Sequence, residues 1–264
     1  MRAGLGLLAM TFISSCRTGG RQAKKPTVVS LNPAATEMIF AIEAQDHLLA
    51  VSDYCDYPEA AQRLPKVGDL VKPDMEAIIA LNPDYVVVFL PTQASVKHDL
   101  EAVGIRTIDL SPESPQEVLE AIEKLGHIMG KDDRARFVVD SLQREMRSIA
   151  FPEKRPRVVV ELSLNPVYVA GNNTFPAALV EAAGGENAFK DVQGYKPVQD
   201  EEINRRHPDM VIMAHQGPAP SQRLGWQGDA PVEIRMDPDL VSRPGPRFVQ
   251  AVRLLNRAFN QWQN

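Results

Sequence analysis

Residues 76–87 read EAIIALNPDYVV, and residues 201–212 read EEINRRHPDMVI. The two segments align without a gap. Each gives an acidic residue, a short helical stretch, a Pro-Asp pair and an apolar run typical of a buried strand. The triplet Leu-Asn-Pro also stands before a segment with helical spacing at both 31–33 and 164–166. A unit that recurs this far along the chain predicts two pseudo-symmetric lobes with a binding cleft between them.

Short β-branched runs alternate with helical patterns on both sides of the repeat. This alternation predicts α/β lobes, each with a parallel sheet covered by helices. In the second lobe, Thr174 is placed to cap a helix that Gly184 ends. The predicted strands are 28–31, 49–51, 85–89, 107–110, 157–162, 210–214 and 232–234, and the predicted helices are 35–42, 75–81, 92–103, 175–183, 202–206 and 247–259.

A long helical segment separates the two lobes. Ser114 and Glu117 fit a capping box with Pro115 at the first helical position, and apolar residues continue at helical spacing up to Ile149. Because Gly130 permits a break, the segment is either two packed helices or one backbone about 50 Å long. We expect one long rigid α-helix that joins the lobes. The predicted parts are a first lobe at 27–113, the helical backbone at 114–150 and a second lobe at 151–264.

The N-terminus is typical of an exported lipoprotein. Arg2 precedes a short apolar run, and the small residues before Cys16 resemble a bacterial lipobox. We expect residues 1–15 to be a signal peptide, Cys16 to carry lipid, and residues 16–26 to form a flexible tether. The alternative is an ordinary signal peptide with an incidental cysteine. If Cys16 is lipidated, Cys55 has no partner within the chain, and we expect it to be a buried free thiol.

The composition and motifs exclude several classes of function. A net charge of −5 gives no basic face for a nucleic acid. The chain has no Gly-rich phosphate loop, no G-x-S-x-G elbow and no H-E-x-x-H motif, so we expect no enzymatic activity. Its five histidines show no metal-ligand spacing. We therefore expect no intrinsic cofactor or metal.

Three motifs carry a resemblance to a known family. They are residues 29–37 (VSLNPAATE), Val67-Gly68 leading to 74–78 (DMEAI), and residues 183–187 (AGGEN). With them the sequence resembles the helical-backbone (class III) periplasmic binding proteins, from about Val28 to the C-terminus. The resemblance implies two lobes joined by a helix and a role in an ABC importer of cobalamin, ferric siderophores or haem.

Within that class, residues 52–58 (SDYCDYP) resemble the cobalamin branch. The resemblance implies a corrinoid as the transported ligand. A corrinoid is large, nearly neutral and edged with amides, so its site needs aromatic faces and hydrogen-bonding groups. Leu70 and Leu240 stand where cobalamin-type relatives carry aromatic residues, which leaves room for another cobamide or a different chelate. The ligand-binding residues implied are Tyr54, Phe89, Tyr168 and Tyr195 (in a loop at 194–197). Asp239 and Arg243, near the last loop, are predicted to bind ligand amides, and the alternative is that they are surface charges.

The resemblance also implies contact with a membrane permease through one glutamate on each lobe. Here these are Glu76 and Glu201, which the repeat places at equivalent positions. Matched acids suit docking onto a two-fold permease dimer with its ATPase subunits. The alternative is that both acids only favour their helix N-termini. We expect the protein itself to be a monomer, held at the membrane by its lipid on the periplasmic or extracellular face.

Other functions remain open at this point. A ferric-siderophore binder of the same class would usually place Arg or Lys deep in the cleft. A haem binder would want an axial Tyr or His, and His215, after the predicted strand 210–214, is the one histidine placed for that contact. A surface scaffold or adhesion lipoprotein without a small ligand is the alternative from another class.

Overall fold

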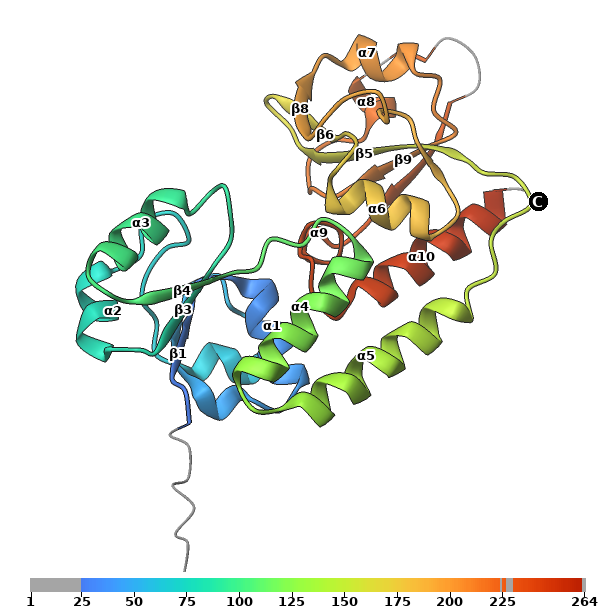
Figure 1. The fold of residues 1–264 in the computed structure, drawn as a ribbon. Coiled ribbons are helices and arrows are strands. Elements are labelled where there is room, and N and C mark those ends of the chain that lie inside the picture. The colour runs from blue at the N-terminus through green and yellow to red at the C-terminus, as the bar shows by residue number, and fades with distance from the viewer. Residues whose placement is uncertain (1–24, 224, 227–229, 263–264) are drawn as a thin grey trace, which may run out of the picture.

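The computed structural model describes residues 25–223, 225–226 and 230–262, and shows two lobes joined by helices (Figure 1). The predicted signal peptide, Cys16 and most of the predicted tether lie outside the described residues. The elements in the first lobe and the connection are β1 (Val28–Ser30), α1 (Pro33–Ala41), β2 (Leu48–Val51), α2 (Met75–Leu81), β3 (Tyr85–Val88), α3 (Ala94–Ala102), β4 (Arg106–Asp109), α4 (Pro115–Ile128) and α5 (Asp132–Arg147). Those that follow are β5 (Arg157–Ser163), β6 (Val167–Ala170), α6 (Phe175–Ala182), β7 (Glu186–Asn187), β8 (Tyr195–Val198), α7 (Asp200–Arg205), β9 (Met210–Met213), α8 (Pro220–Arg223), β10 (Val232–Arg235), α9 (Pro238–Ser242) and α10 (Phe248–Trp262).

The first sheet is parallel throughout, in the order β2-β1-β3-β4. The apolar run in β3 is buried on both faces, as predicted. Val86 and Val88 belong to one hydrophobic core with Ile78 of α2, whereas Val87 belongs to a second core with Ile39 of α1. Because side chains alternate along a strand, an unbroken apolar run fits a strand with a core on each side.

The second sheet has the order β10-β9-β5-β6-β8, and β7 pairs with β5. Strands β10, β9, β5 and β7 run parallel, which confirms the expected α/β lobe. The sequence did not predict β6 and β8, which are antiparallel. The expectation that Leu164-Asn165-Pro166 precedes a helix is wrong. Asn165 has a positive φ of 59° and lies in the turn from β5 to β6, whereas Asn32 caps α1 through its side chain.

The connection between the lobes is two helices, and the expected single long helix is wrong. Gly130 has a φ of 64°, which a right-handed helix does not allow, so the chain turns between α4 and α5. The two helices pack on each other closely enough that a Cβ on Gly126 would lie 2.3 Å from the Cβ of Ala135. Helix α5 then crosses from the first lobe toward the second (Figure 1).

One hydrophobic core extends from the first lobe into the second. It contains Ile39 of α1, Ile122 of α4, Phe175 of α6, and Phe248 and Phe259 of α10, all buried. Helix α10 packs on α6, α9 and α5, so the end of the described chain closes the base between the lobes. No helix in the described part of the chain is both long enough and apolar enough to cross a membrane.

Candidate functional site

A cleft of about 440 Å³ lies between the two lobes. Loops that follow β1, β3 and β4 at their carboxyl ends form one wall, and α6, β8 and α9 contribute the other. The carboxyl edge of a parallel sheet is where such folds bind ligands. The lining residues are Asn32, Pro33, Ala34, Tyr54, Leu70, Phe89, Leu90, Pro91, Thr92, Leu110, Ser111, Pro112, Glu113, Phe175, Tyr195, Asp239, Ser242, Arg243 and Pro244.

Five of the six predicted ligand-binding residues line this cleft. These five residues come from four separate segments of the chain. They are Tyr54, Phe89, Tyr195, Asp239 and Arg243. Tyr168 lies on β6 and is not one of the residues that line the cleft. The sequence missed Phe175, which adds a further ring. It was predicted only as the start of a helix, and its side chain is buried in the core while part of it faces the cleft.

A fully buried amide, Gln93, holds the first-lobe wall of the cleft. Its Oε1 accepts the backbone N–H of Phe89 at 2.8 Å, and its Nε2 donates to the carbonyl of Leu70 at 2.7 Å. Two cleft residues are therefore fixed by one side chain. The sequence analysis did not identify Gln93, because a glutamine before a helix carries no pattern of its own.

Tyr54 is tied to the same loop. Backbone N–H groups of Val71 and Lys72 donate to Asp69 at 2.7 and 3.3 Å and keep the pKa of Asp69 below its usual value, and a hydrogen bond from Tyr54 adds to this effect. The loop therefore links a predicted ligand-binding ring to Leu70 in the cleft wall and to the start of α2.

Tyr195 begins strand β8, so its predicted place in a loop is wrong. Burial raises the pKa of Tyr195 to about 12, and the negative charge of Glu113 contributes in the same direction. The phenol is therefore neutral at every physiological pH. It offers the cleft an aromatic face and a hydrogen-bonding hydroxyl, but no negative charge.

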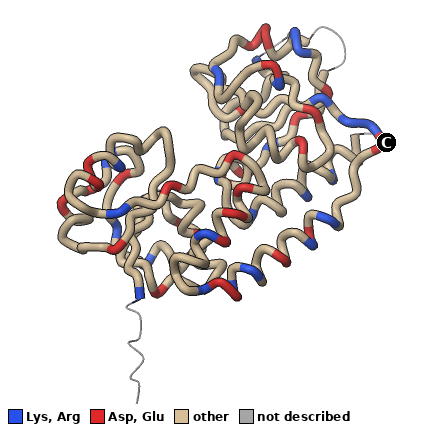
Figure 2. Tube along the Cα trace, viewed as in Figure 1, with Lys and Arg blue, Asp and Glu red and all other residues tan. Residues whose placement is uncertain are grey.

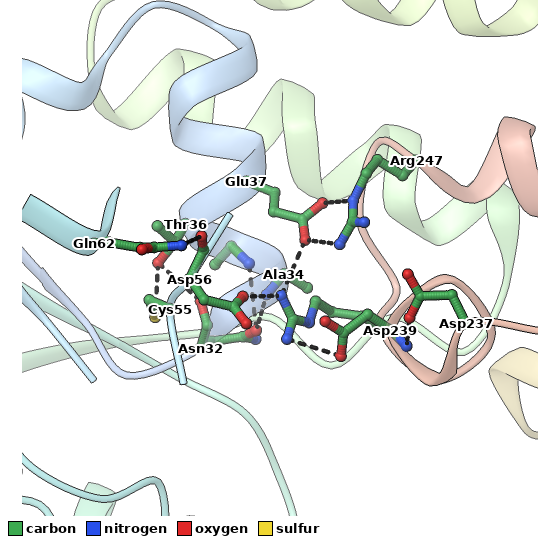
Figure 3. Close-up of polar contacts among 12 residues, drawn as sticks. Asn32, Ala34, Thr36, Glu37, Cys55, Asp56, Gln62, Asp237, Asp239 and Arg247 are labelled. Atoms are coloured by element: carbon green, nitrogen blue, oxygen red, sulfur yellow. Dashed lines mark hydrogen bonds and ion pairs between the residues drawn. The ribbon is translucent and has the colours of Figure 1, made fainter. Parts of the chain in front are cut away.

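Five charged residues form a cluster at the base of the cleft (Figure 3), which we call the inter-lobe cluster: Glu37, Asp56, Asp239, Arg243 and Arg247. Glu37 on α1 is buried and receives two hydrogen bonds from Arg247, at 2.6 and 2.9 Å. Arg243 donates to Asp56 at 2.7 Å and contacts Asp239 at 2.9 Å and Glu37 at 3.4 Å.

This cluster connects the lobes and pairs the cation of the cleft with carboxylates. Glu37 and Asp56 come from the first lobe, whereas Asp239, Arg243 and Arg247 follow the second sheet. Burial disfavours the charge of Arg243, but the hydrogen bond to Asp56 and the nearby carboxylates outweigh it and raise its pKa. Arg243 is the only Lys or Arg among the described residues that line the cleft.

His215 is occupied by contacts within the second lobe. The backbone N–H of Gly217 donates to its Nδ1 at 3.1 Å, so the proton of the neutral ring lies on Nε2, which donates to the buried Glu161 at 3.2 Å. Arg223 binds the same carboxylate at 2.8 and 2.9 Å. His215 is not among the residues that line the cleft, so the structure gives no support to its role as an axial ligand.

Cys55 is a free and buried cysteine, as expected. Thr36 donates a hydrogen bond to its sulfur at 3.2 Å. In the described part of the chain, no group of three or more His, Cys, Asp or Glu residues could hold a metal ion.

Glu76 and Glu201 occupy matched positions on the outer side of the two lobes. Each is the second residue of its helix, α2 or α7, and each is exposed. Figure 2 shows acidic residues at both of these helices.

The two Pro-Asp pairs of the repeat also make the same kind of hydrogen bond. The carboxylate of Asp84 accepts the N–H of Thr27 at 2.8 Å, and that of Asp209 accepts the N–H of Arg157 at 2.7 Å.

Two α/β lobes, a helical connection and a cleft lined from both sides define a bilobed ligand-binding protein. A model of the periplasmic binding protein family matches residues 28–253, and the chain belongs to this family. Family members are substrate-binding proteins of ABC transporters that bind without catalysis and pair with a permease, and this chain is a periplasmic or extracellular binding protein of that kind.

The relatives differ in the ligands their names state. The chain is 29% identical to an uncharacterised ABC-transporter substrate-binding lipoprotein of Bacillus subtilis, over 86% of this chain and 78% of the relative. It is 28% identical to a vitamin B12-binding protein of Salmonella typhi, over 89% and 91%. The periplasmic haem-binding protein of Roseiflexus sp. RS-1 is 23% identical, over 91% and 100%, with a TM-score of 0.75. That last likeness concerns the fold alone.

Proposed function

We propose that the protein captures cobalamin or a related corrinoid in the inter-lobe cleft and delivers it to an ABC permease. The observation that carries this proposal is a cleft with rings from both lobes and no free cation. Tyr54 and Phe89 face it from the first lobe, and Phe175 and Tyr195 from the second. A nearly neutral, amide-edged macrocycle is suited to aromatic faces and hydrogen-bonding groups. The similarity to a vitamin B12-binding protein agrees with this ligand.

The same cleft is poorly suited to the other chelates of this class. Haem carries two propionates and most siderophore complexes are anionic, so each would favour an accessible Arg or Lys. Arg243 is already bound by three carboxylates.

The first test is titration of the soluble domain with cyanocobalamin by calorimetry. We expect saturable one-to-one binding at micromolar Kd or tighter, and a loss of about 1–3 kcal/mol of binding free energy in Tyr54→Ala, because a stacked ring is removed. Tyr168→Ala, which removes a ring that does not line the cleft, is the matched control and should bind like the unaltered protein. Binding of haem or a ferric siderophore in place of cyanocobalamin would overturn the corrinoid assignment.

We also propose that Cys16 carries the lipid that holds the protein at the membrane. The small residues before it fit a lipobox, and the relative from Bacillus subtilis is named a lipoprotein. Cys16→Ser should move the protein from the membrane fraction to the soluble fraction and stop incorporation of labelled palmitate. Cys55→Ser, which alters the buried thiol, should leave the protein membrane-bound. Membrane retention of the Cys16 variant would argue against the anchor.

We further propose that Glu76 and Glu201 contact the two halves of a permease dimer. Both are exposed, and no ion pair is found for either within the described residues. Charges placed alike on two pseudo-symmetric lobes are suited to a partner with two-fold symmetry. The variants that test this contact depend on how each lobe holds its helix, and they are treated in the Discussion.

A further inference from the structure

Arg243 is a largely buried cation, and two of its three carboxylate partners are more exposed than it is. Its side chain is 13% exposed, whereas those of Asp56 and Asp239 are 52% and 41% exposed. The hydrogen bond to Asp56 and the charges of both acids offset the cost of burying the guanidinium. The same two acids occupy donors that Arg243 would otherwise present to the cleft, so their effect extends to the charge of the ligand.

The link between the lobes does not need these two acids. Glu37 is 2% exposed, and Arg247 binds it through two nitrogens, with the guanidinium stacked 4.1 Å from the ring of Tyr57. That pair alone joins α1 to the segment before α10. Without Asp56 and Asp239, Arg243 would keep one long contact of 3.4 Å to Glu37 and would offer its remaining N–H groups to the cleft that it lines.

The charges of the inter-lobe cluster also favour one kind of ligand. Its three carboxylates outnumber its two guanidinium groups, so the cluster carries an excess negative charge. Glu113 on the opposite part of the lining adds a further carboxylate. A ligand with a carboxylate or catecholate near Arg243 would meet two acids that already occupy its donors. Unfavourable charges of this kind reject a competitor without contributing contacts to the preferred ligand.

We propose that Asp56 and Asp239 are specificity-determining residues that exclude anionic ligands from the cleft by neutralising Arg243. The inference rests on the proposed function, because it takes a neutral macrocycle as the preferred ligand. It goes beyond the proposed function because it attributes the discrimination between neutral and anionic ligands to two named carboxylates. The consequence is that removing them turns Arg243 into an anion-binding group without altering the aromatic walls.

The experiment compares two ligands that differ by one charge: cyanocobalamin and its monocarboxylic acid, in which one peripheral amide has been hydrolysed. Calorimetry gives the affinity ratio for the unaltered protein and for the double variant Asp56→Asn/Asp239→Asn. We expect the ratio to shift toward the acid by about tenfold, the effect of one charge interaction of about 1.4 kcal/mol. Near-ultraviolet circular dichroism of each variant checks that the fold is retained.

Adding Arg243→Gln to the double variant is the decisive control. If the freed guanidinium causes the shift, this triple variant should lose most of it. A shift of the same size without Arg243, or a double variant whose ratio does not change, would overturn the inference.

A separate pair of ligands distinguishes this failure from failure of the proposed function. If the unaltered protein binds neither corrinoid, the corrinoid assignment is wrong. The same variants are then titrated with a neutral ferric trihydroxamate and an anionic ferric tricatecholate. If the double variant binds the anionic complex more tightly than the unaltered protein does, the proposed exclusion of anions by Asp56 and Asp239 is supported. If it gains affinity for neither anionic ligand, the proposal is refuted.

Discussion

The helices α2 and α7 present equivalent glutamates, yet the two lobes hold these helices in different ways. In the first lobe, Asp74 caps α2 and accepts the N–H of Ala77 at 2.9 Å. In the second lobe, Gln199 at the cap position of α7 makes no side-chain hydrogen bond. There, the first residue of the helix, Asp200, forms an ion pair with Arg223.

The buried polar side chains that support the two lobes near these helices differ in charge. The first lobe uses the neutral Gln93, which binds the carbonyl of Leu70 in the loop before α2. The second lobe uses Glu161, a fully buried carboxylate that holds Arg223 and His215. The duplicated segment has therefore kept its backbone and its exposed glutamate, while the buried polar groups have diverged. Matched positions of exposed glutamates do not require matched interiors.

The largest expected effect comes from removing these buried groups. Arg223→Leu leaves Glu161 with only the neutral ring of His215 as a side-chain partner among the described residues, and breaking a buried ion pair from one side typically costs about 3–5 kcal/mol. Gln93→Leu leaves the N–H of Phe89 and the carbonyl of Leu70 without their partner, at about 1–3 kcal/mol. Urea unfolding of the two variants measures both changes in the free energy of unfolding.

A double variant tests whether charge is the cause of that difference. Glu161→Leu/Arg223→Leu removes both charges and should be more stable than Arg223→Leu alone, because no unpaired buried carboxylate remains. If the double variant is the less stable of the two, packing around the side chains explains the loss. Equal losses in the Arg223 and Gln93 variants would show that the two lobes do not differ in this respect.

The sequence predicted the features that depend on local pattern, and it missed those that depend on contacts between distant residues. The repeat at 76–87 and 201–212 predicted the matched helices and the strands β3 and β9, because burial and capping are local features. Strand β8 reads YKPV and is largely exposed, so it has neither alternation nor an apolar run. It was therefore placed in a loop.

The charge networks could not be predicted, because their members are distant in sequence. Glu37 and Arg247 are 210 residues apart, and Arg223 and Glu161 are 62 apart. Arg243 was predicted to bind ligand amides, but its geometry shows a cation already held by acids of both lobes. The turn at Gly130 was visible as a possibility, and its positive φ together with the packing of Gly126 on Ala135 decides for two helices.

A smaller effect should be found in both lobes. Asp84 donates its N–H to the Thr27 carbonyl at 2.9 Å, and its carboxylate accepts the Thr27 N–H at 2.8 Å and the Thr27 hydroxyl at 3.0 Å. Asp209 and Arg157 repeat the first two contacts at 2.8 and 2.7 Å. Asp84→Ala and Asp209→Ala should each cost about 1.5–3 kcal/mol, the usual value for a hydrogen bond to a charged group, and the Asp84 variant should lose more because it also loses the hydroxyl contact. A larger loss in the Asp209 variant, measured by urea unfolding, would contradict this account.

The variants with the smallest expected effect on stability are the ones that should abolish transport when combined. Glu76→Arg and Glu201→Arg change exposed side chains, so each should alter the free energy of unfolding by no more than about 0.5 kcal/mol. Each single variant should weaken uptake of labelled cyanocobalamin in cells, and the double variant should abolish it, because both halves of the permease then meet a like charge. Ligand affinity of the purified double variant should be unchanged.

Glu123→Arg/Glu181→Arg makes the same change in charge at two exposed positions away from α2 and α7, and it should transport normally. Transport by the Glu76/Glu201 double variant, or loss of its ligand binding, would refute the docking assignment. If only one of the two single variants loses uptake, the permease depends more on its contact with that lobe than on its contact with the other. The difference in local charge would then be tested first, because the ion pair of Arg223 and Asp200 lies next to Glu201, whereas the neutral Gln93 supports the loop before Glu76.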